Sequence, residues 1–521
     1  MPSYTLRYQA ASFDDNVFDA QQLSRVRGAS LSYLYSGERV ERVLARAPGL
    51  NKLQRIYTGA SQGAFAFQSN GSAALAARSA VENALKRSDL KKNSENDNAP
   101  TGCHEHLGYV VALAAGDDTR ALFAAESLCN VKKLQHESFR LPPYVGGANK
   151  PGGRRDPRPA SMDDEQGRSA AMKSREEFGR SQRQAFYQRM SGQDPGFDFT
   201  DNLQEIIAGA DQALPLSLHD KVAVFYADGD KFGTRFKNAA RSGVHNLGSV
   251  SNTLKDKQRQ LLRDILAWLG EHYASGATNH YFMQGAARFE TLLWGGDENL
   301  FVMPSWLGME FAELFYEKTR DWTLEGDAPW TFSAGLVICD GKTPIRQIRN
   351  VAKELTERNK AFGGAAIQIE VFESLSMPDV DFDSYRRNLY IASDDELGEV
   401  NRQLSIPGDK LGELIKAILR LKEPDGLPRS QLYKMLHKAS QAGAAVARSD
   451  EIDRQLREDF ALWKKRAGRS VSIEEGDIDV LRNLRPWGEA IKAKRPAFSL
   501  SLGMVAMLWD YARPLHFAGQ R

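Results

Sequence analysis

Two segments, each an apolar strand that ends in carboxylates, constrain this chain more than any other feature. The first, AVFYADGDKFG, places Asp228 and Asp230 at the end of an apolar run. The second, LLWGGDENLFVMP, places Asp297 and Glu298 directly after a Gly-Gly turn between two apolar runs. Carboxylates on neighbouring strands, beside a bare glycine turn, suit a pair of hard divalent cations that hold a triphosphate. The two segments therefore predict a sheet with a nucleotide site at its edge.

The chemistry that fits this pattern is nucleotidyl transfer, in which a 3′-hydroxyl attacks an α-phosphate and pyrophosphate leaves. Two metal ions, Mg²⁺ or Mn²⁺, lower the pKa of the attacking hydroxyl and neutralise the leaving group. Strand alternation puts Asp228 and Asp230 on one face, and the predicted metal ligands are Asp228, Asp230 and Asp297. The predicted catalytic carboxylates are Asp228, Asp297 and Glu298, with Glu298 either a further ligand or a supporting group.

Three glycines and a serine complete the predicted site. Gly229 offers its backbone carbonyl to a metal ion, and Gly295 and Gly296 allow the turn and the close approach of phosphates. A Gly-Gly turn also makes an ordinary hairpin, so it is weak evidence alone. Ser333, in the strand-like segment TFSAGLVICDG, either hydrogen-bonds a nucleotide or simply sits in a strand.

The composition is that of a globular chain, and its overall charge is too small to attract nucleic acid. Its 521 residues give room for roughly three or four domains, each with its own core. The formal net charge is +2, so any nucleic-acid contact must be local. The three cysteines lie far apart, which points to a reducing compartment. Because there is neither a signal-peptide pattern nor an apolar run long enough to span a bilayer, we expect a cytoplasmic protein with no membrane contact.

The order hairpin, helix, strand, helix occurs twice along the chain, which predicts an internal duplication. In the second half these elements begin at Leu292, and the last helix carries apolar residues at helical spacing from Ile345 to Leu355. In the first half they begin with the strand–turn–strand segment IYTGASQGAFAF, which starts at Ile56. Its turn contains no carboxylate, so we expect that the first copy has lost the metal site and the second has kept it.

The remaining segments differ from both copies. Lys150 to Met190 carries ten Lys or Arg against six Asp or Glu and includes a charged helix predicted from Ser174 to Met190. It is either a solvated linker or a contact for nucleic acid or a partner. From Pro378 onward the spacing is helical. The predicted fold class is α+β, with four domains: a degenerate palm (1–140), a basic linker (141–215), a catalytic palm (216–378) and an all-helical C-terminal domain (379–521).

These motifs resemble a known family. DGDKF and GGDE are similar to the palm domain of GGDEF-type nucleotidyl cyclases. The segment SAGLVICDGKTPIRQIRNVAKEL resembles the strand and helix that follow the GGDD hairpin in the large subunit of type III CRISPR effector complexes. The resemblance implies two tandem ferredoxin-like palms, synthesis of cyclic oligoadenylate from ATP, and partners that include guide RNA, other effector subunits and an activating target RNA. It also implies that Lys360 neutralises the triphosphate.

Three departures keep alternatives open. The hairpin reads GGDE rather than GGDD, no HD nuclease pattern precedes the first palm, and the linker has no pairs of zinc-binding cysteines. A stand-alone synthase of a cyclic dinucleotide in antiviral signalling is therefore a first alternative. A non-catalytic scaffold subunit that binds RNA is a second, although a scaffold has no need of the four acids.

Overall fold

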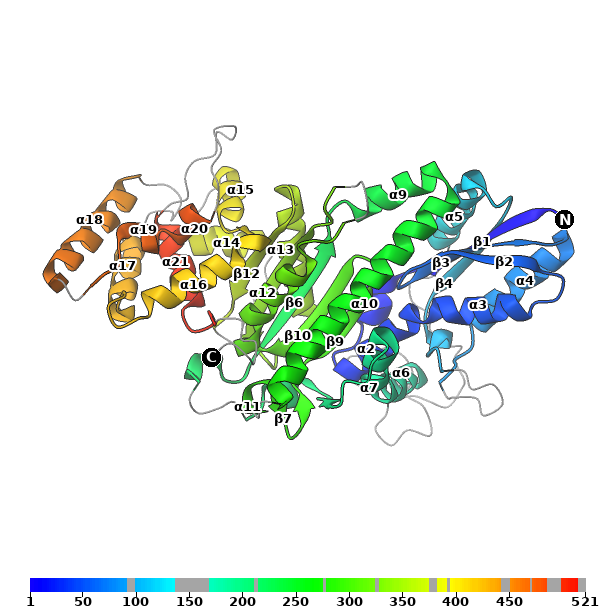
Figure 1. Cartoon of the computed structure of the whole chain (residues 1–521), viewed down its shortest axis with the longest axis horizontal. Coiled ribbons are helices and arrows are strands. Elements are labelled where there is room, and N and C mark those ends of the chain that lie inside the picture. Colours follow the sequence, from blue (N-terminus) through cyan, green and yellow to red (C-terminus); the bar gives the residue numbers. More distant parts are fainter. Residues whose placement is uncertain are drawn as a thin grey trace.

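The structure is a computed structural model that describes residues 1–90, 99–135, 168–209, 214–274, 278–323, 328–373, 382–390, 394–441, 450–468, 471–484 and 498–513. The elements follow one long axis, with the N-terminal sheet at one end, a second sheet in the middle and the C-terminal helices at the other end (Figure 1). None of the helices in the described ranges is long and apolar enough to cross a membrane.

The first sheet has four antiparallel strands in the order β2-β3-β1-β4. Its strands are β1 (Ser3–Ala10), β2 (Asn51–Thr58), β3 (Gln62–Gln68) and β4 (Tyr109–Ala115). Helices α3 (Ser36–Arg46) and α4 (Gly71–Ala84) bury their apolar sides against one face, and α5 (Thr119–Leu134) packs on β1 and β4. The side chain of Asn70 accepts from the Ala73 N–H and so caps α4, a position where a short polar residue satisfies a free helix donor.

The second sheet has six strands in the order β13-β12-β11-β6-β10-β9. They are β6 (Lys221–Gly229), β9 (Glu290–Gly295), β10 (Glu298–Pro304), β11 (Phe332–Asp340), β12 (Ala366–Val371) and β13 (Ile406–Pro407). In both sheets the hairpin lies on one side of the first strand and the final strand on the other, so β2-β3-β1-β4 corresponds to β9-β10-β6-β11. This correspondence confirms the predicted repeat of hairpin, helix, strand and helix.

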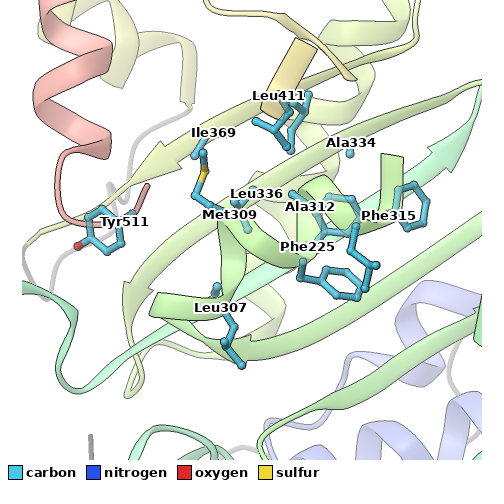
Figure 2. Packing of buried hydrophobic residues seen from close by; sticks show 14 of the residues in the cluster. Phe225, Leu307, Met309, Ala312, Phe315, Ala334, Leu336, Ile369, Leu411 and Tyr511 are labelled. Carbon is cyan, nitrogen blue, oxygen red and sulfur yellow. The ribbon is translucent and has the colours of Figure 1, made fainter. Parts of the chain in front are cut away.

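Helices cover both faces of the second sheet. They are α9 (Phe232–Ser242), α10 (Val244–Ala274), α12 (Gly308–Thr319) and α13 (Ile345–Ala361). Figure 2 shows Met309, Ala312 and Phe315 of α12 stacked on Phe225 and Leu336 of the sheet. Odd-numbered residues of β6 pack toward α12 and even-numbered ones toward α13, as strand alternation requires. Asp228 is even-numbered and therefore belongs to the α13 face.

In the described part of residues 379–521 the chain is helical apart from one short strand, which corrects the prediction of an all-helical domain. Its helices are α14 (Phe382–Tyr390), α15 (Asp394–Gln403), α16 (Leu411–Leu421), α17 (Arg429–Gln441), α18 (Asp450–Ala467), α19 (Glu475–Ile478), α20 (Val480–Asn483) and α21 (Phe498–Leu508). The two-residue strand β13 pairs with β12. Leu411 packs into the same core as α12, so this region is continuous with the second sheet (Figure 2).

The described part of the predicted basic contact, Lys150 to Met190, forms two helices rather than the single predicted one. They are α6 (Ala170–Ser181) and α7 (Arg183–Ser191), separated at Gln182. Helix α6 packs against α2 (Leu23–Leu34), and α7 contacts α10. Several of its arginines pair with acids of the fold, among them Arg175 with Asp19 and Arg183 with Asp198. Residues 150–167, the rest of the predicted contact, lie outside the described residues.

The small remaining elements join these parts. They are α1 (Phe13–Val17), β5 (Asp198–Phe199), α8 (Leu203–Ile207), α11 (Thr278–Tyr281), β7 (Phe282–Met283) and β8 (Ala286–Ala287). Arg27 of α2 makes a fully buried, two-pronged ion pair with Glu290 of β9 and donates to the Gly179 carbonyl of α6. A buried arginine needs such partners, because an unpaired charge in the interior is costly. This pair ties the first half, the linker and the second sheet together.

Candidate active site

Asp228 and Asp297 meet at one edge of the second sheet, as the sequence predicts. Asp228 is the next-to-last residue of β6 and lies opposite Glu298 of β10 and Ser333 of β11. Asp297 lies in the turn between β9 and β10, and its carbonyl accepts from the Gly229 N–H at 3.0 Å. We call residues 295–298 the acidic turn. The acidic turn joins β9 to β10, and β10 pairs directly with β6. The two aspartates therefore come from neighbouring elements.

The environment of the two aspartates favours the binding of a cation. Burial, with the neighbouring charges of Asp228 and Glu298, raises the pKa of Asp297 from its ordinary 3.8 to about 7. Burial also raises the pKa of Asp228, although the hydrogen bond from Lys360 works in the opposite direction. Like charges in a partly dry site resist ionisation together. A perturbed pair of this kind at a cleft marks a functional-site candidate.

Lys360 lies in the last turn of α13 and points back to the sheet edge. Its Nζ donates to Asp228 Oδ2 at 2.5 Å. Burial disfavours the ammonium, but the bond to Asp228 and the negative charges of Asp228, Glu357 and Asp297 together raise the pKa of Lys360. The helix runs to Ala361, so Lys360 belongs to the helix and not to the following loop. The structure brings Lys360 to the predicted carboxylates, and its ammonium partly offsets their charge.

Glu298 is held by Tyr226 of β6 and by Arg349, which lies in the first half of α13. Its Oε1 accepts from the Tyr226 hydroxyl at 2.6 Å and from Arg349 at 3.4 Å. Arg349 also binds Asp14 of α1 with both terminal nitrogens, at 2.7 and 3.1 Å. Glu298 is thus held by a chain of donors. Of its two predicted roles, this environment fits the supporting group better than a further ligand.

Asp230 and Ser333, two predicted site residues, are hydrogen-bonded to each other, and their predicted metal and nucleotide roles remain predictions. Strand β6 ends at Gly229, so the alternation that was to align Asp230 with Asp228 stops before it. Both Asp230 oxygens are taken by donors of the protein: Ser333 Oγ at 2.6 Å, Thr331 Oγ1 at 2.8 Å and the Ala365 N–H at 2.7 Å. Ser333 is fully buried. In this structure the pair fastens β11 to the turn after α13.

The two glycines of the acidic turn have the positive φ angles that the sequence analysis anticipated. Gly295 has φ 151° and Gly296 has φ 66°, values that side-chain-bearing residues rarely adopt. A Cβ on Gly295 would lie 2.5 Å from the Ala60 Cβ, whereas a Cβ on Gly296 would meet nothing within 4 Å. Ala60 belongs to the turn between β2 and β3, which we call the first turn (residues 59–61). The hairpin tips of the two sheets therefore touch.

A cavity of about 560 Å³ opens between the two sheets at these tips. Its walls include Gly295, Gly296 and Asp297 of the acidic turn and Gly59 and Ala60 of the first turn. Six Lys or Arg side chains line it against three carboxylates; the cationic residues are Arg7, Arg55, Arg189, Lys237, Lys255 and Arg259. The volume and the positive lining suit a polyanionic ligand of nucleotide size.

Sequence reasoning missed the contribution of α10 to this site. Lys255 and Gln258 line the cavity from that helix. Lys255 Nζ donates to Thr58 Oγ1 at 2.6 Å, and Gln258 Nε2 donates to the Gly296 carbonyl. Neither lies near a motif along the chain. The available signal was that both fall on one side of a long amphipathic helix, which does not reveal what that side faces.

The donor set fits a divalent cation bound together with a nucleotide. Among the residues that the structure describes, no three His, Cys, Asp or Glu side chains are grouped so as to hold a metal ion. Mg²⁺, however, is commonly held by one or two carboxylates together with substrate phosphates and water. Asp228 and Asp297 supply two carboxylates, and Gly229 can add a backbone carbonyl. These hard oxygen donors suit Mg²⁺ or Mn²⁺.

Comparison with known proteins places this site in a family. Residues 221–365 match the family model described as Cas10/Cmr2, second palm domain. The matched segment contains Asp228, Asp297 and Lys360. No curated protein matches the chain.

The fold beyond that domain is that of the Csm1 structures. A crystal structure of Csm1 from T. onnurineus has a TM-score of 0.54 at 14% identity, over 98% of this chain and 70% of that chain. A Csm1–Csm4 cassette in complex with pppApApA gives the same values, and a cassette in complex with cA3 gives 0.51 and 13% over the same shares. At such identities the likeness shows the fold alone. The chain carries a Cas10/Cmr2 second palm domain within a Csm1-like fold.

Proposed function

We propose that this chain is the large subunit of a type III CRISPR effector complex and that it makes cyclic oligoadenylate from ATP. The observation that carries the proposal is the pair Asp228 and Asp297 at one edge of the second sheet, where Asp297 lines a cationic cavity between two sheets of the same strand order. The matching Csm1–Csm4 cassettes, which bind pppApApA or cA3, support the choice of adenine nucleotides.

In this proposal the second sheet is the catalytic palm and the first is a degenerate palm. The ranges are those expected from the sequence: 1–140 for the degenerate palm, 141–215 for the linker, 216–378 for the catalytic palm and 379–521 for the C-terminal domain. The first turn carries no acid, yet Ala60 touches Gly295. The degenerate palm thereby supplies one wall of the nucleotide cavity.

Asp228 and Asp297, with the Gly229 carbonyl, are the groups that would hold Mg²⁺ or Mn²⁺. When bound, such ions neutralise charge on the attacking and leaving oxygens of a phosphoryl centre. In each step the 3′-hydroxyl oxygen forms a bond to the α-phosphorus of the next ATP, the bond to pyrophosphate breaks, and the hydroxyl proton is released. The same step within one chain closes the ring.

The protein's own residues orient these groups. Lys360 is already charged and bound to Asp228, so it is placed to transfer its hydrogen bond to a phosphate oxygen when a nucleotide arrives. Arg349 and Tyr226 hold Glu298 at the turn. The network limits movement of the acidic turn, and fixed charges are more effective in a partly dry site than in water.

The proposed partners are guide RNA and other effector subunits, with target RNA as the activator. The Csm4 seen with the similar chains supports the subunit part of this proposal. Cytoplasmic action is part of the same proposal, and the three buried free cysteines are compatible with it.

The test incubates purified protein with each labelled NTP and Mg²⁺ or Mn²⁺, in RNA-bound and RNA-free form. The proposal expects ATP alone to give cyclic products, and RNA release to be steep in salt, since phosphate contacts exchange with counterions. Full activity of a nucleic-acid-free preparation would promote the stand-alone synthase. No product under any condition would promote the scaffold.

A further inference from the structure

Helix α10 contacts the hairpin tips of both sheets with adjacent turns of one face. It has 31 residues, so it is about 46 Å long. Figure 1 shows it crossing from the second sheet toward the first. Lys255 and Gln258 are three residues apart and therefore neighbours on the helix surface. Each makes one specific bond, and the two bonds end on different sheets.

The bond from Lys255 reaches the first sheet. Its ammonium donates to Thr58 Oγ1 at 2.6 Å, directly before the first turn. Burial, assisted by Arg55, lowers the pKa of Lys255 to about 8, so its solvation by water has been largely replaced by the protein. A partly buried ammonium is costly unless a partner compensates it, and the Thr58 hydroxyl is one such partner.

The bond from Gln258 reaches the acidic turn. The side chain is 5% exposed, and its amide donates to the carbonyl of Gly296. This carbonyl directly precedes Asp297. The Asp297 carbonyl in turn accepts from the Gly229 N–H beside Asp228. Any displacement of Gly296 therefore moves Asp297 relative to Asp228.

We infer that Lys255 and Gln258 are positioning residues that fix the separation of the first turn and the acidic turn, so that α10 sets the width of the nucleotide cavity. The inference rests on the proposed function only for its effect on turnover. Two nucleotides react only when the attacking oxygen and the phosphorus are held at close and constant distance. Bonds from α10 to the first turn and to the acidic turn hold the two turns at a constant distance. The contact of Ala60 with Gly295, in contrast, only prevents a closer approach.

The test compares Lys255→Met and Gln258→Met in the full-length protein. Methionine matches glutamine in length, is one atom shorter than lysine, and removes the donor at both positions. Gln258→Glu is a second variant, of the same shape but with an acceptor facing the Gly296 carbonyl. The matched control is Gln260→Met, because Gln260 is exposed on the same helix and bonds only Asp264 within it.

Hydrogen exchange is the primary measurement, since it does not depend on activity. Loss of one buried hydrogen bond should speed exchange about tenfold in peptides over 292–300 for both Gln258 variants and over 56–62 for Lys255→Met. The control should match wild type. Unchanged exchange in both turns, or an equal rise in the control, overturns the inference.

Turnover is the second measurement. If wild type makes oligoadenylate, the Lys255 and Gln258 variants should lose about tenfold in kcat with little change in KM, because alignment and not binding is impaired. An unchanged kcat beside faster exchange refutes the effect on the reaction. An inactive wild type refutes the proposed function instead, and the exchange data still decide whether α10 fixes the two turns.

Discussion

Replacing Asp297 by asparagine should stabilise the protein at alkaline pH while it removes activity. The pKa of Asp297 is about 7 in the folded protein, against an ordinary value of 3.8. Below pH 3.8 both states hold the proton, so the carboxyl costs nothing. Between pH 3.8 and about 7 the carboxyl ionises in the unfolded state but stays protonated in the folded state, which lowers the free energy of unfolding of wild type. The asparagine variant does not ionise and keeps that stability.

The magnitude follows from that interval. At roughly 1.4 kcal/mol for each pH unit, the interval from 3.8 to about 7 corresponds to an upper limit of about 4 kcal/mol. The side chain is only half-buried and borders an open cavity, so water screens part of this cost. We expect Asp297→Asn to raise the free energy of unfolding by about 2 kcal/mol at pH 8 and by nothing measurable near pH 4.

The assay is urea unfolding across that pH range, followed by tryptophan fluorescence, with buried Trp294 three residues from the change. Asp321→Asn, at an exposed carboxylate of the same domain, is the control and should leave the pH dependence as in wild type. Mg²⁺ should recover stability in wild type at pH 8 and not in Asp297→Asn. Parallel pH profiles for wild type and Asp297→Asn would refute the electrostatic account of the site.

Three further substitutions separate the roles of neighbouring residues. Lys360→Met should raise the KM for ATP about tenfold in steady-state kinetics, because it removes a charge-assisted donor. An unchanged KM would exclude a contact between Lys360 and a phosphate. Ser333→Ala should lower the free energy of unfolding in urea by about 1–3 kcal/mol, since it leaves a buried carboxylate oxygen unpaired, and it should leave the KM for ATP unchanged. A rise in KM alone would support the nucleotide role of Ser333. Gly295→Ala should reduce turnover more than Gly296→Ala, because only its Cβ meets the first turn, and the reverse order would contradict the packing of the two tips.

The repeated element order and the position of the acids could be predicted because each depends on local pattern. Apolar strands, a Gly-Gly turn and helical spacing after Ile345 all lie within short windows, and the second sheet follows them. Pairing of β6 with β10 then brings Asp228 and Asp297 together without any further information. Strand β1 escaped notice because its buried face includes Arg7 and Gln9, polar residues that pair with other elements.

The rest of the site depends on contacts that no local pattern encodes. Asp230 follows the spacing of a strand residue, but the strand stops at Gly229 and Lys231 adopts φ 60°, which turns the chain. Ser333 satisfies Asp230 across 103 positions of sequence. The cavity exists only because the two hairpin tips meet under α10, and that meeting is set by packing of the whole chain.

The proposed nucleotidyl transfer on ATP depends on Asp228 and Asp297. The most direct test is the rate at which RNA-bound protein converts labelled ATP to cyclic oligoadenylate with Mg²⁺ or Mn²⁺, measured side by side for wild type, Asp228→Ala and Asp297→Ala. The account predicts product from wild type and none above background from either variant, although both stay folded. Wild-type rates in either variant would contradict it.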